Sequence, residues 1–281
     1  MNDLLILGFQ AVQSFVFWSV VALGACIGSF LNVVILRLPE RTFFKNARSV
    51  CPTCGVMIPF YFNIPVVGYF ILRGKANCCG TKISWHYPAV EFATAVIFGL
   101  LYLKFPFSGW SVGSGIFEPA IFVRWAHAAI FISLMLAMSV IDAKLMIIPD
   151  ELSIGMIVLS PLVAWIHPDL TLVGSLIGIA AGGGLLYGVA WSYWFVRKQY
   201  GLGFGDVKLL AAIGGWLGWQ SILPTLFLGS IVGSIIGIAV MVIYRQEGWQ
   251  SKIPFGPFLA LGAVTHLIFG PEALYIFSGG Q

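Results

Sequence analysis

The stretch VQSFVFWSVVALGACIGSFLNVVIL, residues 12–36, decides the class of fold, because none of its side chains carries a charge. A hydrocarbon core of ~30 Å is crossed by about 20 such residues in an α-helix. A secretory signal would begin with basic residues and be shorter, whereas the first 36 residues contain no Lys or Arg. We therefore predict a retained membrane-spanning helix.

The rest of the chain has the same character. Of its 281 residues 59% are hydrophobic and only 9% are charged, whereas a soluble domain has about 25% charged residues. This composition predicts an all-α polytopic membrane protein with about eight transmembrane helices. The expected spans are 12–36, 89–104, 121–141, 151–167, 171–196, 207–221, 223–244 and 254–277.

Basic residues predict the orientation of these spans, because Lys and Arg accumulate in cytoplasmic loops. Seven of them lie between the first and second spans: Arg37, Arg41, Lys45, Arg48, Arg73, Lys75 and Lys82. Only Lys104 and Arg124 fall on the opposite side. The N-terminus is then outside the cell, and Asp142 and Asp206 both lie at the cytoplasmic ends of their helices.

The polar segment 37–88 is predicted to be a small cytoplasmic insert between helix 1 (residues 1–36) and a transmembrane core (residues 89–281). Its first cysteines, Cys51 and Cys54, have the C-x-x-C spacing of half a zinc knuckle. The other two, Cys78 and Cys79, are adjacent, and His86 could replace one of them as a ligand. These residues leave open a structural zinc site or a knuckle without metal.

Two glycine ladders with a four-residue period occur in the expected core. Their members are Gly174, Gly178 and Gly182, and Gly229, Gly233 and Gly237. Small residues at this spacing let helices approach closely in lipid. We expect them to be packing sites rather than a path for a substrate.

The acids near the membrane are the candidates for chemistry, because charges there are costly and usually functional. Asp150 suits the positive start of a helix, but Asp142 ends one, where the helix dipole disfavours an acid. Asp206 begins a helix and could be an N-cap. Gly203 and Gly205 beside it are not needed for capping, and they would give an extended peptide room to approach.

Two aspartates brought together can act as an acid–base pair that shares a proton. The ionised member draws a proton from water as it attacks a carbonyl, and the protonated member donates to the oxygen or the leaving amine. Lys208 either tunes Asp206 or marks the membrane interface. The alternative function is a transporter that uses Asp142 and Asp206 as an ion path, although transporters place such acids near the midplane.

Several stretches together resemble the bacterial type IV prepilin peptidases, which are GxGD-type aspartic peptidases. The resemblance covers nearly the whole chain. It is carried by GSFLNVVILRLP (28–39), CPTC (51–54), NIPVVGYFILRGK (63–75), ISWHYPAVE (83–91), Asp142 with the later Ile-Pro-Asp, GFGDVK (203–208) and IPFGPFLALG (253–262).

This resemblance implies that Asp142 and Asp206 are the catalytic pair, with Gly203, Gly205, Lys208 and Asp150 supporting them. The implied substrates are prepilins or pseudopilins of type IV pili or type II secretion, and no nucleic acid is involved. Their basic leader is cut after a glycine at the cytoplasmic face of the inner membrane. It further implies that the new N-terminal residue is methylated with S-adenosylmethionine, and Gly74 matches a glycine linked to that step.

The cysteine pattern departs from the family's C-x-x-C…C-x-x-C. Ala76 stands at the third cysteine, Cys79 matches the fourth, and Cys78 is additional. If zinc binds, its ligands would be Cys51, Cys54, Cys78 and Cys79.

Overall fold

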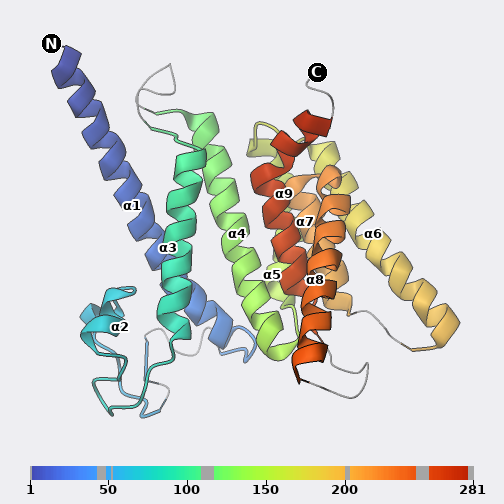
Figure 1. Ribbon diagram of the computed structural model, residues 1–281, viewed down its shortest axis with the longest axis horizontal. Helices are drawn as coiled ribbons and strands as arrows, with labels where there is room; N and C mark the ends of the chain where they lie inside the picture. The colour runs from blue at the N-terminus through green and yellow to red at the C-terminus, as the bar shows by residue number, and fades with distance from the viewer. Residues whose placement is uncertain are drawn as a thin grey trace. The chain divides into compact units, whose positions relative to one another are not determined.

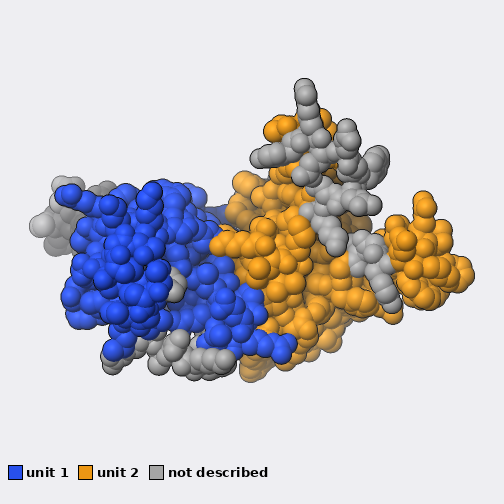
Figure 2. Space-filling view, turned by 90° about the horizontal axis from the view of Figure 1, so that it is seen from below, with its two compact units in different colours: residues 1–133 blue, residues 134–281 orange. Residues whose placement is uncertain are grey.

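The computed structural model is almost entirely helical (Figure 1), as the apolar sequence predicts. It describes residues 2–42, 49–51, 53–108, 117–199, 203–244 and 253–277, with the side chains in these ranges except those of residues 2–11, 244 and 271–277. The chain divides into two compact units, residues 1–133 and residues 134–281 (Figure 2).

Unit 1 contains two complete long helices, α1 (Asn2–Arg37) and α3 (His86–Lys104), and a small polar insert. It also contains the first part of α4 (Pro119–Leu145), which continues into unit 2. The insert lies between α1 and α3 and holds the short helices η1 (Phe60–Asn63) and α2 (Val67–Ile71).

Helices α1 and α3 pack closely because glycines lie where they cross. A Cβ atom on Gly28 would lie 2.6 Å from the Cα atom of Glu91, and one on Gly24 would lie 2.8 Å from the Cβ atom of Phe98. Neither position therefore accepts a side chain while the two backbones stay in place. This contact brings the polar residues that follow Gly28 against Glu91.

Unit 2 contains the end of α4 and five further α-helices. These are α5 (Asp150–Ile166), α6 (Leu172–Arg197), α7 (Phe204–Leu217), α8 (Ile222–Tyr244) and α9 (Gly256–Phe277), with the short η3 (Trp219–Ser221) before α8. The helix α7 is central, since it packs against α5, α6 and α9. Every residue from Leu209 to Trp216 is buried.

The glycine ladders pack helices together, as predicted, at most of their positions. On α6, Cβ atoms on Gly178 and Gly182 would lie 2.0 Å and 2.5 Å from carbonyl oxygens of α7. On α8, one on Gly229 would lie 2.9 Å from the carbonyl oxygen of Phe258 in α9. Gly174 differs, because the nearest atom to its Cβ position belongs to Thr171 of its own loop.

Eight helices of at least 14 residues occur in the described ranges, and each overlaps one of the eight predicted spans. Five described segments are long and apolar enough to cross a membrane: Val12–Arg37, His86–Lys104, Pro119–Leu145, Leu172–Arg197 and Trp219–Ile243. The chain is thus a multi-spanning membrane protein. The 14-residue α7 is shorter than the ~20 residues that cross a bilayer, and it packs against α5, α6 and α9,.

Candidate active site and cysteine cluster

Asp142 lies in the last turn of α4 and is buried, with 6% of its surface exposed. Its carboxylate oxygen Oδ2 accepts a hydrogen bond from the backbone N–H of Gly256 at 3.0 Å. Gly256 is the first residue of α9, so the positive end of that helix faces the carboxylate,. The start of α9 thereby offsets the unfavourable position of Asp142 at the end of α4.

Gly256 is a site residue that the sequence did not single out. A Cβ atom at this position would lie 2.6 Å from Oδ2 of Asp142, so only glycine lets the backbone approach. The signal available was the Gly-Pro pair at the predicted start of the last helix, in the IPFGPF stretch. Every residue except proline has a backbone N–H, however, so the Gly-Pro pair alone did not indicate that Asp142 accepts this hydrogen bond.

Asp206 lies in the first turn of α7 and is half-buried. The N-cap of α7 is Gly203, which has an ordinary extended backbone and no capping side chain. The interpretation of Asp206 as an N-cap is therefore wrong. The acid is the third residue of the helix, where the dipole stabilises its charge.

The two aspartates are 64 positions apart in the sequence, yet the residues beside them, Gly205 and Gly256, both contact Ile148. Ile148, in the link between α4 and α5, packs against the starts of both α7 and α9. Its side chain lies 3.2 Å from the Cβ position of Gly205 on α7 and 3.3 Å from that of Gly256 on α9. The room left by Gly205 is thus filled by Ile148 in this structure.

Lys208 forms an ion pair with Asp150, the first residue of α5. The pair joins the first residue of α5 to the fifth residue of α7, two positions after Asp206. Lys208 thus has an ion-pair partner on a neighbouring helix. Because both side chains reach solvent, the pair contributes little to stability,, but it links α7 to the segment that follows Asp142.

This arrangement has the parts of an acid–base pair. Two carboxyl groups lie at the ends of helices, one buried and one half-buried, and the backbone N–H of Gly256 binds the buried one. Like charges at such a site favour a shared proton, which is the state that activates water and protonates a leaving group.

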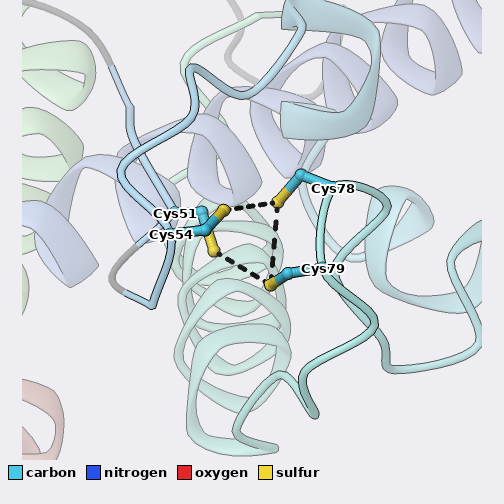
Figure 3. A group of neighbouring side chains, drawn as sticks. All are labelled: Cys51, Cys54, Cys78 and Cys79. Atoms are coloured by element: carbon cyan, nitrogen blue, oxygen red, sulfur yellow. Dashed lines mark hydrogen bonds between the residues drawn. The ribbon is translucent and has the colours of Figure 1, made fainter.

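The four cysteines of the insert also come together. Figure 3 shows Cys51 and Cys54 on one loop facing Cys78 and Cys79 on another. Their sulfur atoms all lie within 4.8 Å of one another, with 3.7 Å between Cys51 and Cys79 and 3.2 Å between Cys54 and Cys78. Four thiolates around one zinc ion at a Zn–S distance of ≈ 2.3 Å lie about 3.8 Å apart, so the cluster fits that ion.

The two loops have the same backbone fold, which explains the departure in the cysteine pattern. In the first, Cys51 donates its N–H to Val56 and accepts from Gly55; in the second, Ala76 donates to Thr81 and accepts from Gly80. Ala76 thus occupies the place of Cys51. Cys78, two residues later, brings the fourth sulfur to the cluster instead.

The backbone also prepares Cys51 as a ligand. Hydrogen bonds from the backbone N–H groups of Cys54 and Thr53 lower the pKa of the Cys51 thiol to about 6. A thiolate is the form that binds metal. His86, the alternative ligand, is not a member of the cluster.

Gly74 lies in a tight turn of the insert, next to Arg73, and both residues have a positive φ, 68° and 50°. The N–H of Lys75 closes the turn by bonding to the carbonyl of Leu72 at 3.0 Å. A Cβ atom on Gly74 would lie 2.9 Å from the hydroxyl of Tyr69. Any other residue here is strained and displaces that tyrosine.

Family comparisons match both units. Residues 129–238 match the model of the type IV leader peptidase family, and residues 22–105 match that of the bacterial peptidase A24 N-terminal domain. No solved structure matches the chain.

Relatives from three bacteria, each named prepilin leader peptidase/N-methyltransferase, are similar over most of their length. The relative from Pseudomonas aeruginosa is 34% identical, with 90% of each chain covered. That from Stutzerimonas stutzeri is 33% identical with 89% of each covered, and that from Pectobacterium carotovorum is 33% identical with 92% of this chain and 95% of the relative covered. The chain therefore belongs to the type IV leader peptidase family, that of the prepilin leader peptidase/N-methyltransferases.

Proposed function

We propose that this protein cleaves the leader peptide from type IV prepilins and pseudopilins, and then methylates the new N-terminal residue. The observation that carries the cleavage is the placement of Asp142 beside Gly256 and of Ile148 against both Gly256 and Gly205, the neighbour of Asp206, in a chain of this family. The methyl transfer is proposed because the relatives are named N-methyltransferases as well as leader peptidases.

In the proposed mechanism Asp142 and Asp206 share one proton and hold a water molecule. The ionised carboxylate takes a proton from that water as its oxygen attacks the carbonyl carbon of the scissile glycine. The carboxylic acid donates its proton to the carbonyl oxygen, and the leaving amine is protonated when the C–N bond breaks. The titration belongs to the pair, so the two roles are shared between them.

The remaining site residues support this pair. Gly203 is exposed and lacks a side chain beside Asp206, so an extended leader can lie along the start of α7, whereas Gly205 makes room for Ile148,. The ion pair of Lys208 with Asp150 keeps that start fixed against the segment after Asp142. We regard these four as positioning residues.

The protein is proposed to lie in the inner membrane with its N-terminus outside and its aspartates at the cytoplasmic face. The seven basic residues between the first two spans favour this orientation,. It lets a basic leader that has not crossed the membrane reach the aspartates directly. Membrane lipid covers the exposed apolar faces of the helices.

For methylation, S-adenosylmethionine is the proposed methyl donor. The proposed division of labour assigns residues 1–36 to the first helix, residues 37–88 to the methylation-linked insert and residues 89–281 to the peptidase core. Gly74 belongs to the insert, where its turn positions Tyr69.

A synthetic prepilin with its leader tests both activities of the purified protein in lipid nanodiscs. We expect one product cut after the glycine, and in the presence of S-adenosylmethionine a further gain of one methyl group, both read by mass spectrometry. Absence of the cut product would overturn the peptidase proposal. An unmethylated cut product would overturn the methyltransferase proposal alone.

We further propose that Cys51, Cys54, Cys78 and Cys79 hold a structural zinc ion, which would fix the two loops of the insert together. We expect one zinc per chain by elemental analysis. Serine at Cys78 should weaken zinc binding more than about 100-fold, because loss of even an outer-shell partner costs 10–100-fold.

Because Ala76 and Cys51 have matching backbone positions, a second substitution should restore the zinc binding that Cys78→Ser removes. Adding Ala76→Cys to Cys78→Ser puts the sulfur back at the place equivalent to Cys51, and zinc should return. Cys26→Ser is the matched control, since Cys26 lies on α1 and outside the cluster. Full zinc content in the single variant Cys78→Ser would contradict the proposed ligand set.

A further inference from the structure

Three polar side chains from two apolar helices of unit 1 meet in one place. Ser29 and Asn32 come from α1, and Glu91 comes from α3. The close approach of the helices at Gly28 brings them together, since a Cβ atom there would lie 2.6 Å from the Cα atom of Glu91. None of the three has a part in peptide cleavage or in the cysteine cluster.

Glu91 is surrounded by neutral donors. Its oxygen Oε2 accepts the backbone N–H of Val66 at 2.7 Å, and the side chains of Ser29 and Asn32 are neutral donors to the same carboxylate. A carboxylate between apolar helices is costly unless a positive charge accompanies it. Because Glu91 and Ser29 are only half-buried, a ligand can reach them.

Asn32 supplies a second, independent indication of a ligand. It is 3% exposed, and its amide nitrogen donates to the carbonyl of Tyr87 at 3.0 Å. Its amide oxygen Oδ1 has no hydrogen-bond partner among the residues that the structure describes. An acceptor buried in this way is destabilising, so the site lacks a donor.

The backbone that Glu91 holds is strained. Val66 has φ 62° and ψ −54°, and a positive φ is a conformational outlier for a β-branched residue,. Strain of this kind persists where the surroundings impose it, and it clusters at ligand sites. Glu91 is thus the contact that ties the insert to α3 at this point.

We propose that Glu91, Asn32 and Ser29 form a binding site for a primary ammonium group. An ammonium has three N–H donors and one positive charge. Glu91 offers two carboxylate oxygens and one negative charge, and the Ser29 hydroxyl and the Asn32 amide oxygen are further acceptors at the same crossing of helices.

Two participants in the proposed methyl transfer carry such a group, so this inference rests on that proposed function. One is the N-terminus that cleavage creates on the pilin. The other is the amino acid end of S-adenosylmethionine. The chemistry that Glu91 recognises is the same in both.

The test is Glu91→Gln in the full-length protein. Glutamine keeps an oxygen that accepts the N–H of Val66, so the contact with the insert remains while the charge is lost. Methyl transfer to a pilin peptide with a free N-terminus is measured twice, once with varied peptide and once with varied S-adenosylmethionine. We expect KM to rise at least about tenfold for one of them, the size expected for loss of a charge-assisted hydrogen bond.

A higher KM for the peptide assigns the site to the pilin N-terminus, and a higher KM for S-adenosylmethionine assigns it to the methyl donor. Glu40→Gln, at an exposed turn, is the matched control, and prepilin cleavage reports on folding. If Glu91→Gln fails to cleave, Ser29→Ala replaces it, with a smaller rise in KM expected.

Unchanged KM values in a variant that cleaves and methylates would overturn the ammonium site alone. If the wild-type protein transfers no methyl group, the methyltransferase proposal fails first and the ammonium site with it. The two failures are therefore distinguishable.

Discussion

Asparagine at either Asp142 or Asp206 is expected to lower kcat for leader cleavage by a factor of about a thousand or more. General acid–base catalysis contributes about 10²–10⁴-fold, and neither residue can share a proton once its partner is an amide. KM should change little, because the substitution removes an interaction with the reacting atoms rather than leader binding. Cleavage of a synthetic prepilin, followed by mass spectrometry, measures both constants.

Asparagine is suited to this test because it preserves the local structure. Its amide oxygen can still accept the N–H of Gly256 at position 142, and its size is that of aspartate. Asp169→Asn is the matched control, since this acid is exposed beyond the far end of α5. A variant of Asp142 or Asp206 that keeps more than about a tenth of wild-type kcat would exclude that residue from the chemistry.

The helices could be predicted from the sequence because apolar runs of sufficient length have few other structures in a membrane. The span predicted at 151–167 became α5, Asp150–Ile166. The span predicted at 207–221 became the shorter α7, Phe204–Leu217. Hydropathy does not tell whether lipid or protein surrounds a helix, and α7 is buried among α5, α6 and α9.

The candidate site was only partly predictable. Charge asymmetry predicts that Asp142 and Asp206 lie at the same side of the membrane, but the contact of Asp142 with α9 depends on a backbone N–H 114 positions away. The pairing of Lys208 with Asp150 likewise depends on how α5 packs against α7. The role of Cys78 required the folded loops, because Ala76 and Cys51 match in backbone position rather than in residue type.

Alanine at Gly178 is expected to have the second large effect, through the packing of α7. The added Cβ atom would lie 2.0 Å from the carbonyl oxygen of Gly214, so α6 and α7 must separate by more than about 1 Å,. Overpacking of this kind costs about 1–3 kcal/mol, and the apparent Tm should fall by several degrees. Because α7 carries Asp206, cleavage should fall about 100-fold, the cost of an ångström-scale misplacement.

Gly184→Ala on the same helix isolates this cause, since nothing lies within 4 Å of its Cβ position. Alanine favours a helix over glycine by about 1 kcal/mol, so this control should raise the apparent Tm slightly and leave cleavage intact. The same substitution thus acts with opposite signs at two positions six residues apart on α6. Equal shifts in Tm for the two variants would mean that the crossing of α6 and α7 does not hold Asp206 in place.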